Sequence, residues 1–190
     1  MDRRERISPS SRDLHLLADE IQSIGFSCQR CGACCRPGSG DSGTVFASHE
    51  EVGTLVESGA GSWEEVASPY PEFVTVANGA EVTFGWCIRH KGEQCRFLSD
   101  LGCTAYPSRP WICRTYPFAL VEGELVVSDC PGLGIPISRE DALALARDLV
   151  GRARFEAADE ERVRAVYAMA QIPEGKRCVV DGSGITILDD

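Results

Sequence analysis

The sequence predicts a small α+β domain that is rich in loops and stabilised by metal, with short hairpins and a C-terminal helical pair. Three observations lead to this fold class. Ten of the 190 residues are cysteines, the helical and strand-like patterns are short, and glycine and proline repeatedly interrupt them. The apolar fraction of 43% and charged fraction of 25% are typical of a globular chain that buries a core.

The first regular element is a predicted helix that follows a flexible N-terminus, residues 1–11. Apolar residues recur at helical spacing over residues 12–24, and Gly25 is a typical helix stop. A cysteine block follows at once, over residues 28–35, and leads into a segment rich in glycine and serine. We therefore expect the cysteines of this block to lie on irregular backbone.

Two short helices and a ribbon are predicted next. Ser48 and Ser62 each stand three residues before a glutamate, which is the capping-box pattern at the start of a helix. Residues 73–88 alternate loosely between apolar and polar positions around Asn78-Gly79, a dipeptide typical of hairpin turns. These elements flank the cysteine block but add no cysteine before Cys87.

The C-terminal part predicts a hairpin, two helices and a second hairpin. Two short strands surround Gly123, and Ser138 caps a helix over residues 139–152. A second helix is expected from Asp159 to about residue 170, and a turn between β-branched runs predicts a hairpin over 176–188. We expect residues 12–135 to form the cysteine-cluster domain, with residues 136–190 packed on it.

The charge of the chain argues against two classes of partner. The formal net charge is −10, which disfavours binding to nucleic-acid phosphates or to an anionic membrane surface. No run approaches the roughly 18 apolar residues of a membrane span, and the N-terminus lacks the apolar core of a signal peptide. We therefore expect a cytoplasmic protein whose partner is another protein.

The number of cysteines points to metal. A reducing cytosol does not maintain disulfides, and buried structural thiols usually occur singly. A disulfide framework is the alternative, but disulfide scaffolds are typically short secreted domains. Clustered thiols in a cytoplasmic chain are therefore best explained as metal ligands.

The most specific motif is Cys28-x2-Cys31-x2-Cys34-Cys35. A Cys-x2-Cys step lets two thiolates converge on one metal, and two such steps in series supply three convergent ligands. Neighbouring side chains diverge from the backbone, so Cys34 and Cys35 suit two metals, or a ligand and a reserve, better than one tetrahedral site. The motif therefore predicts a metal centre and leaves the number of sites open.

The second half of the chain supplies the remaining candidate ligands at wider spacings. They are Cys87, Cys95, Cys103, Cys113 and Cys130. These spacings are too wide for a local zinc finger, so such a site would be closed by tertiary folding. Metal in such a site adds folding free energy, on the order of 10 kcal/mol for structural zinc peptides.

Two arginines adjoin the candidate ligands. Four thiolates on zinc or on an oxidised four-iron cluster leave about two negative charges, which Arg109 and Arg114 could offset while donating hydrogen bonds to sulfur. The alternative is that both are ordinary surface or ion-pair arginines. The neighbouring aromatic residues are expected to pack around the site rather than contact a substrate.

The order of these motifs resembles the YkgJ-type CxxCxxCC cysteine-cluster family of zinc- or iron-chelating proteins. The likeness covers about residues 28–131 and includes Arg109-Pro110 and Cys113-Arg114. It implies eight metal-binding cysteines and leaves Cys87 and Cys178 surplus. The implied ligands are Cys28, Cys31, Cys34, Cys35, Cys95, Cys103, Cys113 and Cys130. The resemblance implies no defined activity.

Zinc and an iron–sulfur cluster both suit these thiols. The Cys-x2-Cys-x2-Cys run with a remote Cys130-Pro131 is similar to the ferredoxin arrangement, which favours a cluster of the four-iron type. Eight thiolates also divide evenly into two tetrahedral zinc sites. The spacing therefore favours iron–sulfur and leaves Zn²⁺ as the alternative.

Other candidate residues carry weaker signals. His90 lies between Cys87 and Cys95 and could join a mixed site, although an exposed loop histidine is the simpler interpretation. Cys87 or Cys178 could act as a nucleophile, but a cysteine in a strand-like run is usually a small buried apolar residue. No hydrolase, nucleotide-binding or metalloprotease motif is present, so whether the protein is an enzyme stays open.

Two functions remain after these exclusions. The first is an iron–sulfur protein that transfers electrons or supports the maturation or modification of a partner protein. The second is a non-enzymatic zinc module whose surface binds another protein. Buffering or delivery of metal is a third hypothesis, which predicts weak and exchangeable occupancy. Iron, zinc and acid-labile sulfide contents separate these functions.

Overall fold

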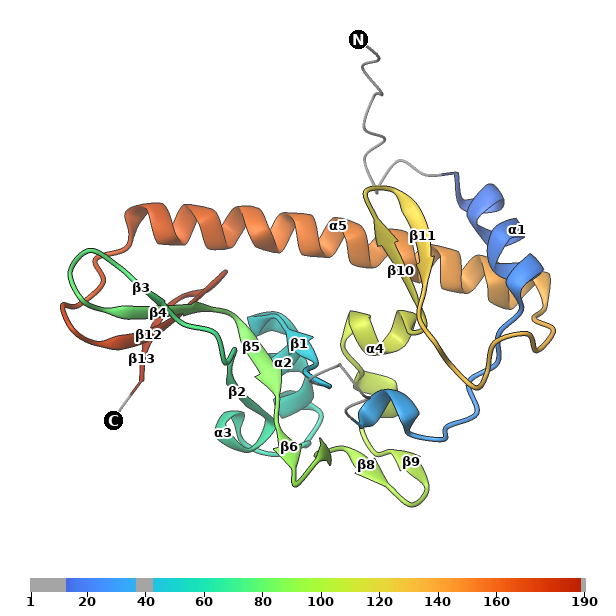
Figure 1. Cartoon of the computed structure of the whole chain (residues 1–190), viewed down its shortest axis with the longest axis horizontal. Coiled ribbons are helices and arrows are strands. Elements are labelled where there is room, and N and C mark those ends of the chain that lie inside the picture. The colour runs from blue at the N-terminus through green and yellow to red at the C-terminus, as the bar shows by residue number, and fades with distance from the viewer. Residues whose placement is uncertain (1–12, 37–42, 189–190) are drawn as a thin grey trace, which may run out of the picture. The chain divides into compact units, whose positions relative to one another are not determined.

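The computed structural model in Figure 1 describes residues 13–36 and 43–188, and these form two compact units. Unit 1 contains the chain up to Cys34 together with Trp111–Glu156. Unit 2 contains Cys35–Pro110 together with the chain from Ala157 onward. The flexible segment expected at 1–11 lies outside the described residues. Each unit is made of two separate segments of the chain, so this division does not correspond to the domain boundary expected at residue 135. That boundary stays a prediction.

Unit 1 is built on helices and one hairpin. Asp13 begins its first helix by accepting hydrogen bonds from the backbone N–H groups of His15 and Leu16, at 2.7 and 3.2 Å. Gly25 ends that helix with a φ of 75°, as predicted. The elements are α1 (Leu14–Ile24), α4 (Trp111–Thr115), β10 (Phe118–Val121), β11 (Glu124–Val127) and the first part of α5 (Arg139–Met169).

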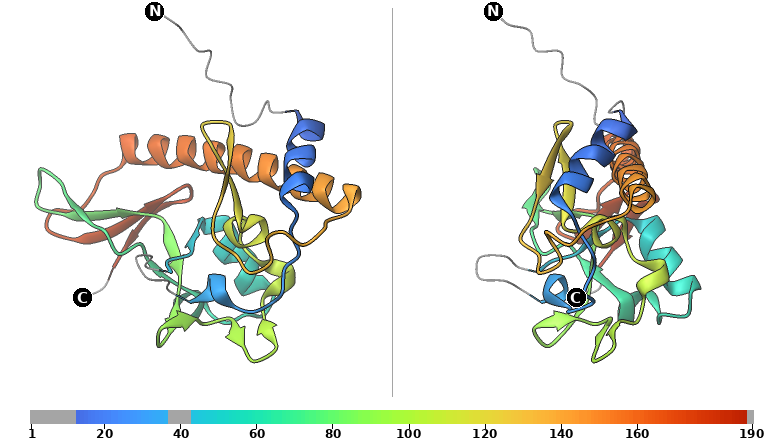
Figure 2. Two further views of the ribbon diagram at one scale, coloured as in Figure 1. Left: turned by 45° about the vertical axis from the view of Figure 1, so that its right-hand side comes forward. Right: turned by 90° about the vertical axis from the view of Figure 1, so that its right-hand side faces the viewer.

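The core of unit 1 joins α1, the β10–β11 hairpin and α5. Leu17 and Ile21 of α1 are fully buried with Leu149 of α5 and Phe118 of β10. Figures 1 and 2 show α1 and the hairpin lying against the N-terminal half of α5. Burying such side chains stabilises a fold by about 1.5–3 kcal/mol each. This core anchors the segment that enters the cysteine run and the segment that follows Cys130.

Unit 2 is built from small sheets and two capped helices. Ser48 and Ser62 form the two predicted capping boxes, each with the glutamate three residues later. Its helices are α2 (His49–Glu57), α3 (Trp63–Val66) and the 3-10 helix η3 (Tyr106–Ser108). Its strands are β1 (Phe46–Ala47), β2 (Ala67–Pro69), β3 (Val74–Thr75), β4 (Glu81–Phe84), β5 (Trp86–Ile88), β6 (His90–Lys91), β7 (Gln94–Cys95), β8 (Leu98–Ser99), β9 (Gly102–Cys103), β12 (Arg177–Asp181) and β13 (Gly184–Ile187). The 3-10 helix η2 (Ala33–Cys35) crosses the boundary between the units.

Two sheets hold unit 2 together. The four-stranded sheet has the order β13-β12-β4-β3, and the three-stranded sheet has the order β1-β5-β2. The expected ribbon over 73–88 and the expected C-terminal hairpin are both present in the larger sheet. Strand β12 pairs in parallel with β4, so that Cys178 lies opposite Val82. This pairing brings the C-terminal strands into the core of unit 2.

The predicted pair of C-terminal helices is wrong, because α5 is one helix of 31 residues. Ser138 caps it as expected, by accepting from the Asp141 N–H at 3.0 Å. Residues 153–158, the expected break, contain neither glycine nor proline and favour helix. Arg152 also bonds Glu156 one turn later, at 2.7 Å. The helix therefore continues through this segment. The α+β, loop-rich fold class is otherwise confirmed.

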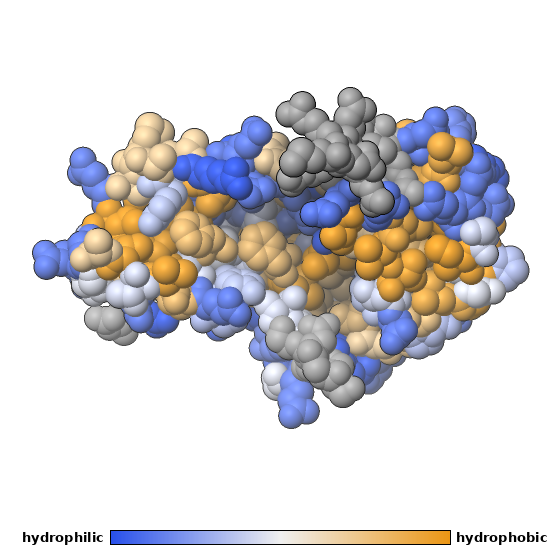
Figure 3. Space-filling model, turned by 45° about the horizontal axis from the view of Figure 1, so that its top comes forward, coloured by the Kyte–Doolittle hydropathy of each residue, from blue (hydrophilic) through white to orange (hydrophobic). Residues whose placement is uncertain are grey.

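The surface of each unit carries some apolar side chains (Figure 3). Leu16 and Val121 are exposed on unit 1, and Val74 and Met169 are exposed on unit 2. Scattered apolar side chains are normal on folded proteins. Within the described residues, no helix combines the length and apolar character needed to span a bilayer.

Candidate metal centre

The centre of unit 1 is organised by a short backbone pairing between two distant segments. The N–H of Ser27 donates to the carbonyl oxygen of Gly132 at 3.0 Å, and the N–H of Gly134 donates to that of Gly25 at 3.1 Å. Phe26 and Leu133 form an antiparallel bridge between these bonds. This pairing aligns the segment that leads into Cys28 with the segment that follows Cys130.

Two glycines make this close approach possible. A β-carbon at Gly132 would collide with the carbonyl oxygen of Ser27, and one at Gly25 would lie 2.7 Å from that of Ile135. Gly25 also has a φ of 75°, which L-residues with side chains rarely adopt. Larger residues at Gly25 or Gly132 would therefore push the segments apart.

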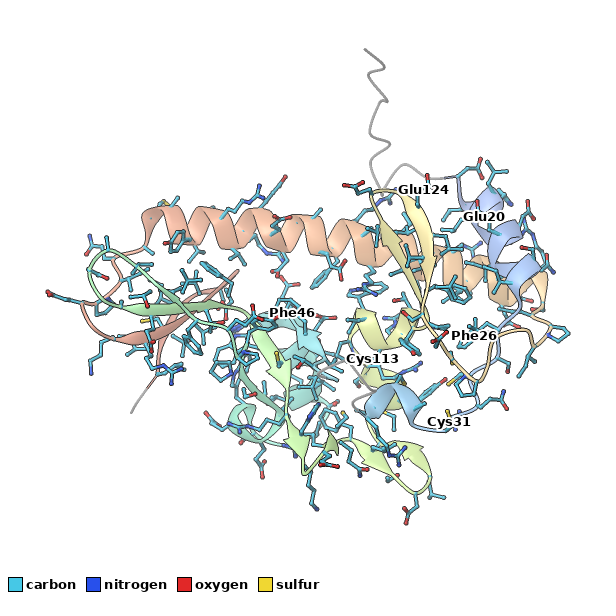
Figure 4. All side chains as sticks on the ribbon, viewed as in Figure 1. Glu20, Phe26, Cys31, Phe46, Cys113 and Glu124 are labelled. Atoms are coloured by element: carbon cyan, nitrogen blue, oxygen red, sulfur yellow. The ribbon has the colours of Figure 1, made fainter. Side chains whose placement is uncertain are left out.

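Phe26 anchors the pairing to the core. Its ring packs edge-on against Phe118 with centroids 5.6 Å apart, and Phe118 is fully buried in strand β10. Leu133, on the opposite segment, also packs on this core. Figure 4 labels Phe26 beside the β10–β11 hairpin. The backbone on both sides of the pairing is therefore fixed by buried contacts.

The surroundings of Cys130 shift the pKa of its thiol. Burial raises the pKa of Cys130, the Gly132 N–H at 3.5 Å from its sulfur lowers it, and the charges of Cys31, Cys34 and Cys28 raise it again. The bond from Ser27 to Gly132 places the segment that enters the Cys-x2-Cys-x2-Cys run beside the segment that follows Cys130.

The loop that carries the run turns sharply. Arg30 and Gly32, on either side of Cys31, have φ angles of 52° and 71°. Left-handed residues that alternate with right-handed ones turn successive N–H groups to one side, a geometry found at many iron–sulfur sites. Figure 4 labels Cys31 on this loop, just before η2. Cys28, Cys31 and Cys34 are exposed, whereas Cys130 is half-buried.

The thiols of unit 1 are not arranged as a closed ligand set. Among residues 13–36 and 43–188, no three His, Cys, Asp or Glu side chains already surround a common point at ligand distance. Without a cation, neighbouring thiolates repel one another. Metal binding removes the protons of the thiols and brings the sulfurs together around the cation. Four thiols with an N–H directed at one sulfur suit zinc and iron equally by donor type.

Unit 2 holds five other cysteines, of which two lie on matching hairpins. His90 pairs with Cys95 in the β6–β7 hairpin, and Leu98 pairs with Cys103 in the β8–β9 hairpin. The bonds that flank them also match, from Arg96 N–H to Arg89 O at 3.0 Å and from Thr104 N–H to Phe97 O at 2.8 Å. Cys95 and Cys103 thus hold equivalent positions in two hairpins eight residues apart. This structural repeat has no counterpart in the sequence pattern. Cys35 also belongs to unit 2.

Cys87 and Cys178 are core residues. Cys178 is fully buried in β12, and Cys87 is 4% exposed in β5, where it lies between Phe46 and Ser68 of the neighbouring strands. Burial raises the pKa of Cys87 to about 11 and raises that of Cys178 as well. Both therefore stay protonated near neutral pH, unlike a nucleophile or a metal ligand.

The two candidate arginines make local contacts. Arg109 stacks 3.6 Å above the ring of Tyr106, and its Nε donates to the Tyr106 carbonyl oxygen at 3.1 Å. Arg114 lies over Trp111 and forms an ion pair with Asp148 at 3.0 Å. These contacts do not test whether Arg109 and Arg114 offset the charge of the thiolates, which stays a prediction. Cys113 lies on α4 between these two arginines in sequence (Figure 4).

His90 lies opposite Cys95 on the β6–β7 hairpin, with its Nε2 3.1 Å from the carbonyl oxygen of Gly43. Directly opposite residues of an antiparallel pair place their side chains on the same face. The position is compatible with a mixed site, and ligation by His90 stays a prediction.

A polar cluster in unit 2 was not expected from the sequence. The buried Asp181 carboxylate accepts from the Trp86 Nε1–H at 2.7 Å and the Ser183 hydroxyl at 2.6 Å, and it lies 3.1 Å from Nδ1 of His49. Ser183 also meets His49 at Nδ1, the ring nitrogen that faces Asp181, and not at the opposite nitrogen where the serine of a catalytic triad lies. The cluster therefore stabilises the fold. The sequence signalled only the turn at Asp181-Gly-Ser-Gly184. It did not indicate that Trp86 and His49, which are distant in sequence, contact Asp181.

A comparison with family models decides the relationship. The CxxCxxCC model, described as "Putative zinc- or iron-chelating domain", matches residues 27–131, more than half of the chain. The chain belongs to the CxxCxxCC family. The suspected family is therefore confirmed, and the protein is a cysteine-rich domain of the zinc- or iron-chelating class. No curated protein and no solved structure matches this CxxCxxCC protein.

Proposed function

We propose that this CxxCxxCC protein carries an iron–sulfur cluster of the four-iron type and transfers electrons or supports the maturation or modification of a partner protein. One observation carries the proposal. Gly132, two residues after Cys130, accepts a hydrogen bond from Ser27, which directly precedes the Cys-x2-Cys-x2-Cys run, and Cys130 is followed by Pro131. A three-cysteine run completed by a remote Cys-Pro matches the ligand pattern of four-iron ferredoxins.

The surroundings of these thiols support the same choice. The Gly132 N–H directed at the Cys130 sulfur is the kind of hydrogen bond that sets cluster potentials. The loop around Cys31 turns through positive φ angles at Arg30 and Gly32, a feature shared with many iron–sulfur loops. When bound, a cluster would supply one-electron chemistry. The chain itself holds the thiols, donates to sulfur and leaves the loop exposed toward an electron donor or acceptor.

The remaining candidate ligands and arginines belong to the proposal. Eight cysteines would bind metal in total, with Cys35, Cys95, Cys103 and Cys113 as the ligands beyond the four near Cys130. Arg109 and Arg114 would offset negative charge near the sulfurs. The net charge of −10 supports a protein partner over nucleic acid or an anionic membrane. A cytoplasmic location belongs to this proposal too.

Structural zinc is the second candidate. An all-thiolate donor set suits tetrahedral Zn²⁺, and the family description includes zinc. In this case metal would hold unit 1 together, and the protein would act through its surface. A zinc protein is colourless and unaffected by dithionite.

Elemental analysis tests the proposal. Iron, zinc and acid-labile sulfide are measured per chain in protein purified without oxygen and without a metal-binding tag. Iron with matching sulfide, together with a visible band that dithionite bleaches, is the expected result. Stoichiometric zinc without sulfide would refute the iron–sulfur proposal and favour the structural module.

A further inference from the structure

We infer that Cys28, Cys31, Cys34 and Cys130 form one four-thiolate metal site that unit 1 completes by itself. The inference rests on the proposed metal binding and deepens it, because it assigns the ligands that share one site. It applies to zinc and to an iron–sulfur cluster alike. The other cysteines would then be unnecessary for this site.

The backbone pairing is the first argument. Ser27 and Gly132 are bonded at 3.0 Å, Cys28 follows Ser27 directly, and Cys130 precedes Gly132 by two residues. The start of the motif and the segment of the remote cysteine are therefore tied together by the fold before any metal arrives. A ligand pair that is held in place in this way binds metal without a further ordering cost.

The core of unit 1 is the second argument. Phe26 and Leu133, which flank the pairing, both pack on the buried cluster that contains Phe118 and Leu149. Every element of this scaffold belongs to unit 1. The backbone beside Cys28 and Cys130 is therefore held by contacts within this unit.

The position of the unit boundary is the third argument. Cys34 belongs to unit 1, whereas the adjacent Cys35 belongs to unit 2 with Cys95 and Cys103. The double cysteine thus divides between two units, in agreement with the divergence of neighbouring side chains.

Cooperative protection from alkylation tests the assignment. Exposed Cys28, Cys31 and Cys34 should react rapidly with iodoacetamide unless metal holds them. The full-length, metal-loaded protein is pulse-labelled, and each cysteine is quantified by mass spectrometry. Cys130→Ser is compared with the matched control Cys103→Ser, which removes a thiol of unit 2.

Cys130→Ser should speed the labelling of the three thiols of the run at least tenfold and leave Cys95 and Cys103 unchanged. Cys103→Ser should leave the run protected. The inference is overturned if Cys103→Ser also exposes the run, or if Cys130→Ser leaves it protected. Circular dichroism checks that each variant is folded, and Cys31→Ser, which should expose Cys28, Cys34 and Cys130, replaces Cys130→Ser if that variant unfolds.

Two further arms sharpen the result. Cys113→Ser tests the fifth cysteine of unit 1 and should keep the four thiols protected, whereas loss of protection would overturn the four-member set. The metal in each sample is measured in parallel. Zinc with the expected protection pattern would refute the iron–sulfur proposal and keep the ligand assignment. Iron, together with protection that is lost on replacement of any of the eight cysteines, would support the iron–sulfur proposal and refute the ligand assignment.

Discussion

The backbone N–H of Ser27 donates to the carbonyl oxygen of Gly132 at 3.0 Å, and Gly132 in turn donates its own N–H to the sulfur of Cys130 at 3.5 Å. One residue therefore links the segment that enters the cysteine run to the thiol that completes it. The close approach depends on glycine, because any β-carbon there would meet Ser27.

Replacement of Gly132 by alanine should weaken both folding and metal binding. The added methyl group would separate the two segments, at a cost of about 1–3 kcal/mol in the free energy of unfolding. Urea denaturation and metal content per chain measure the two effects. Gly53→Ala is the control, since its β-carbon would meet nothing within 4 Å inside α2. It should stabilise the protein by about 0.5–1 kcal/mol. Equal behaviour of the two variants would contradict the role of Gly132.

Asp181→Asn should destabilise unit 2 in a pH-dependent way. Burial acts to raise the pKa of Asp181, but hydrogen bonds from Ser183, Trp86 and His49 lower it below its usual value overall. The stabilisation is therefore complete above the unfolded-state pKa, about 3.9, and is lost as pH falls through the folded-state value. At pH 7 the variant should lose about 1–3 kcal/mol.

Chemical denaturation followed by tryptophan fluorescence, from pH 7 down to pH 3, checks this prediction. The difference between Asp181→Asn and the parent protein should shrink toward the acid end. Asp148→Asn breaks an exposed ion pair with Arg114 and should cost less than about 1 kcal/mol throughout. A pH-independent difference for Asp181→Asn would show that the charge of the carboxylate is unimportant.

Cys87 and Cys178 should resist alkylation whether or not metal is present. Burial raises the pKa of Cys87 to about 11, so its thiolate is scarce near pH 8. The raised pKa contributes stability below the unfolded-state value of about 8.5, and this is lost as pH rises toward 11. Labelling in the presence and absence of a chelator, with unfolded protein as reference, measures the effect. Labelling of either residue on metal removal alone would make it a ligand candidate.

Metal removal should loosen unit 1 more than unit 2. The amides of Ser27 and Gly134 hold the pairing beside the four thiols, and they should exchange hydrogen faster after chelation. The amide of Gly85, which donates to Val180 at 3.1 Å in the sheet of unit 2, serves as reference and should change little. Hydrogen-exchange mass spectrometry on the full chain measures both. Uniform loss of protection would instead indicate one cooperative unit.

Local patterns predicted most of the short elements. The capping boxes at Ser48 and Ser62 depend on residues three apart, and the turn at Gly123 depends on adjacent ones, so both were readable. The break expected between the helix over 139–152 and Asp159 was wrong, because residues 153–158 contain no glycine or proline and the helix continues through them.

The sequence by itself determined the family of this protein and its class as a cysteine-rich, zinc- or iron-chelating domain, because the spacing of the cysteines is readable along the chain. Only the tertiary structure decided which distant segments pair. It brings Cys130 to Cys28 through a pairing of segments about one hundred residues apart, and it buries Cys178 through the parallel pairing of β12 with β4. Such long-range pairings depend on the packing of the core, which no local pattern records.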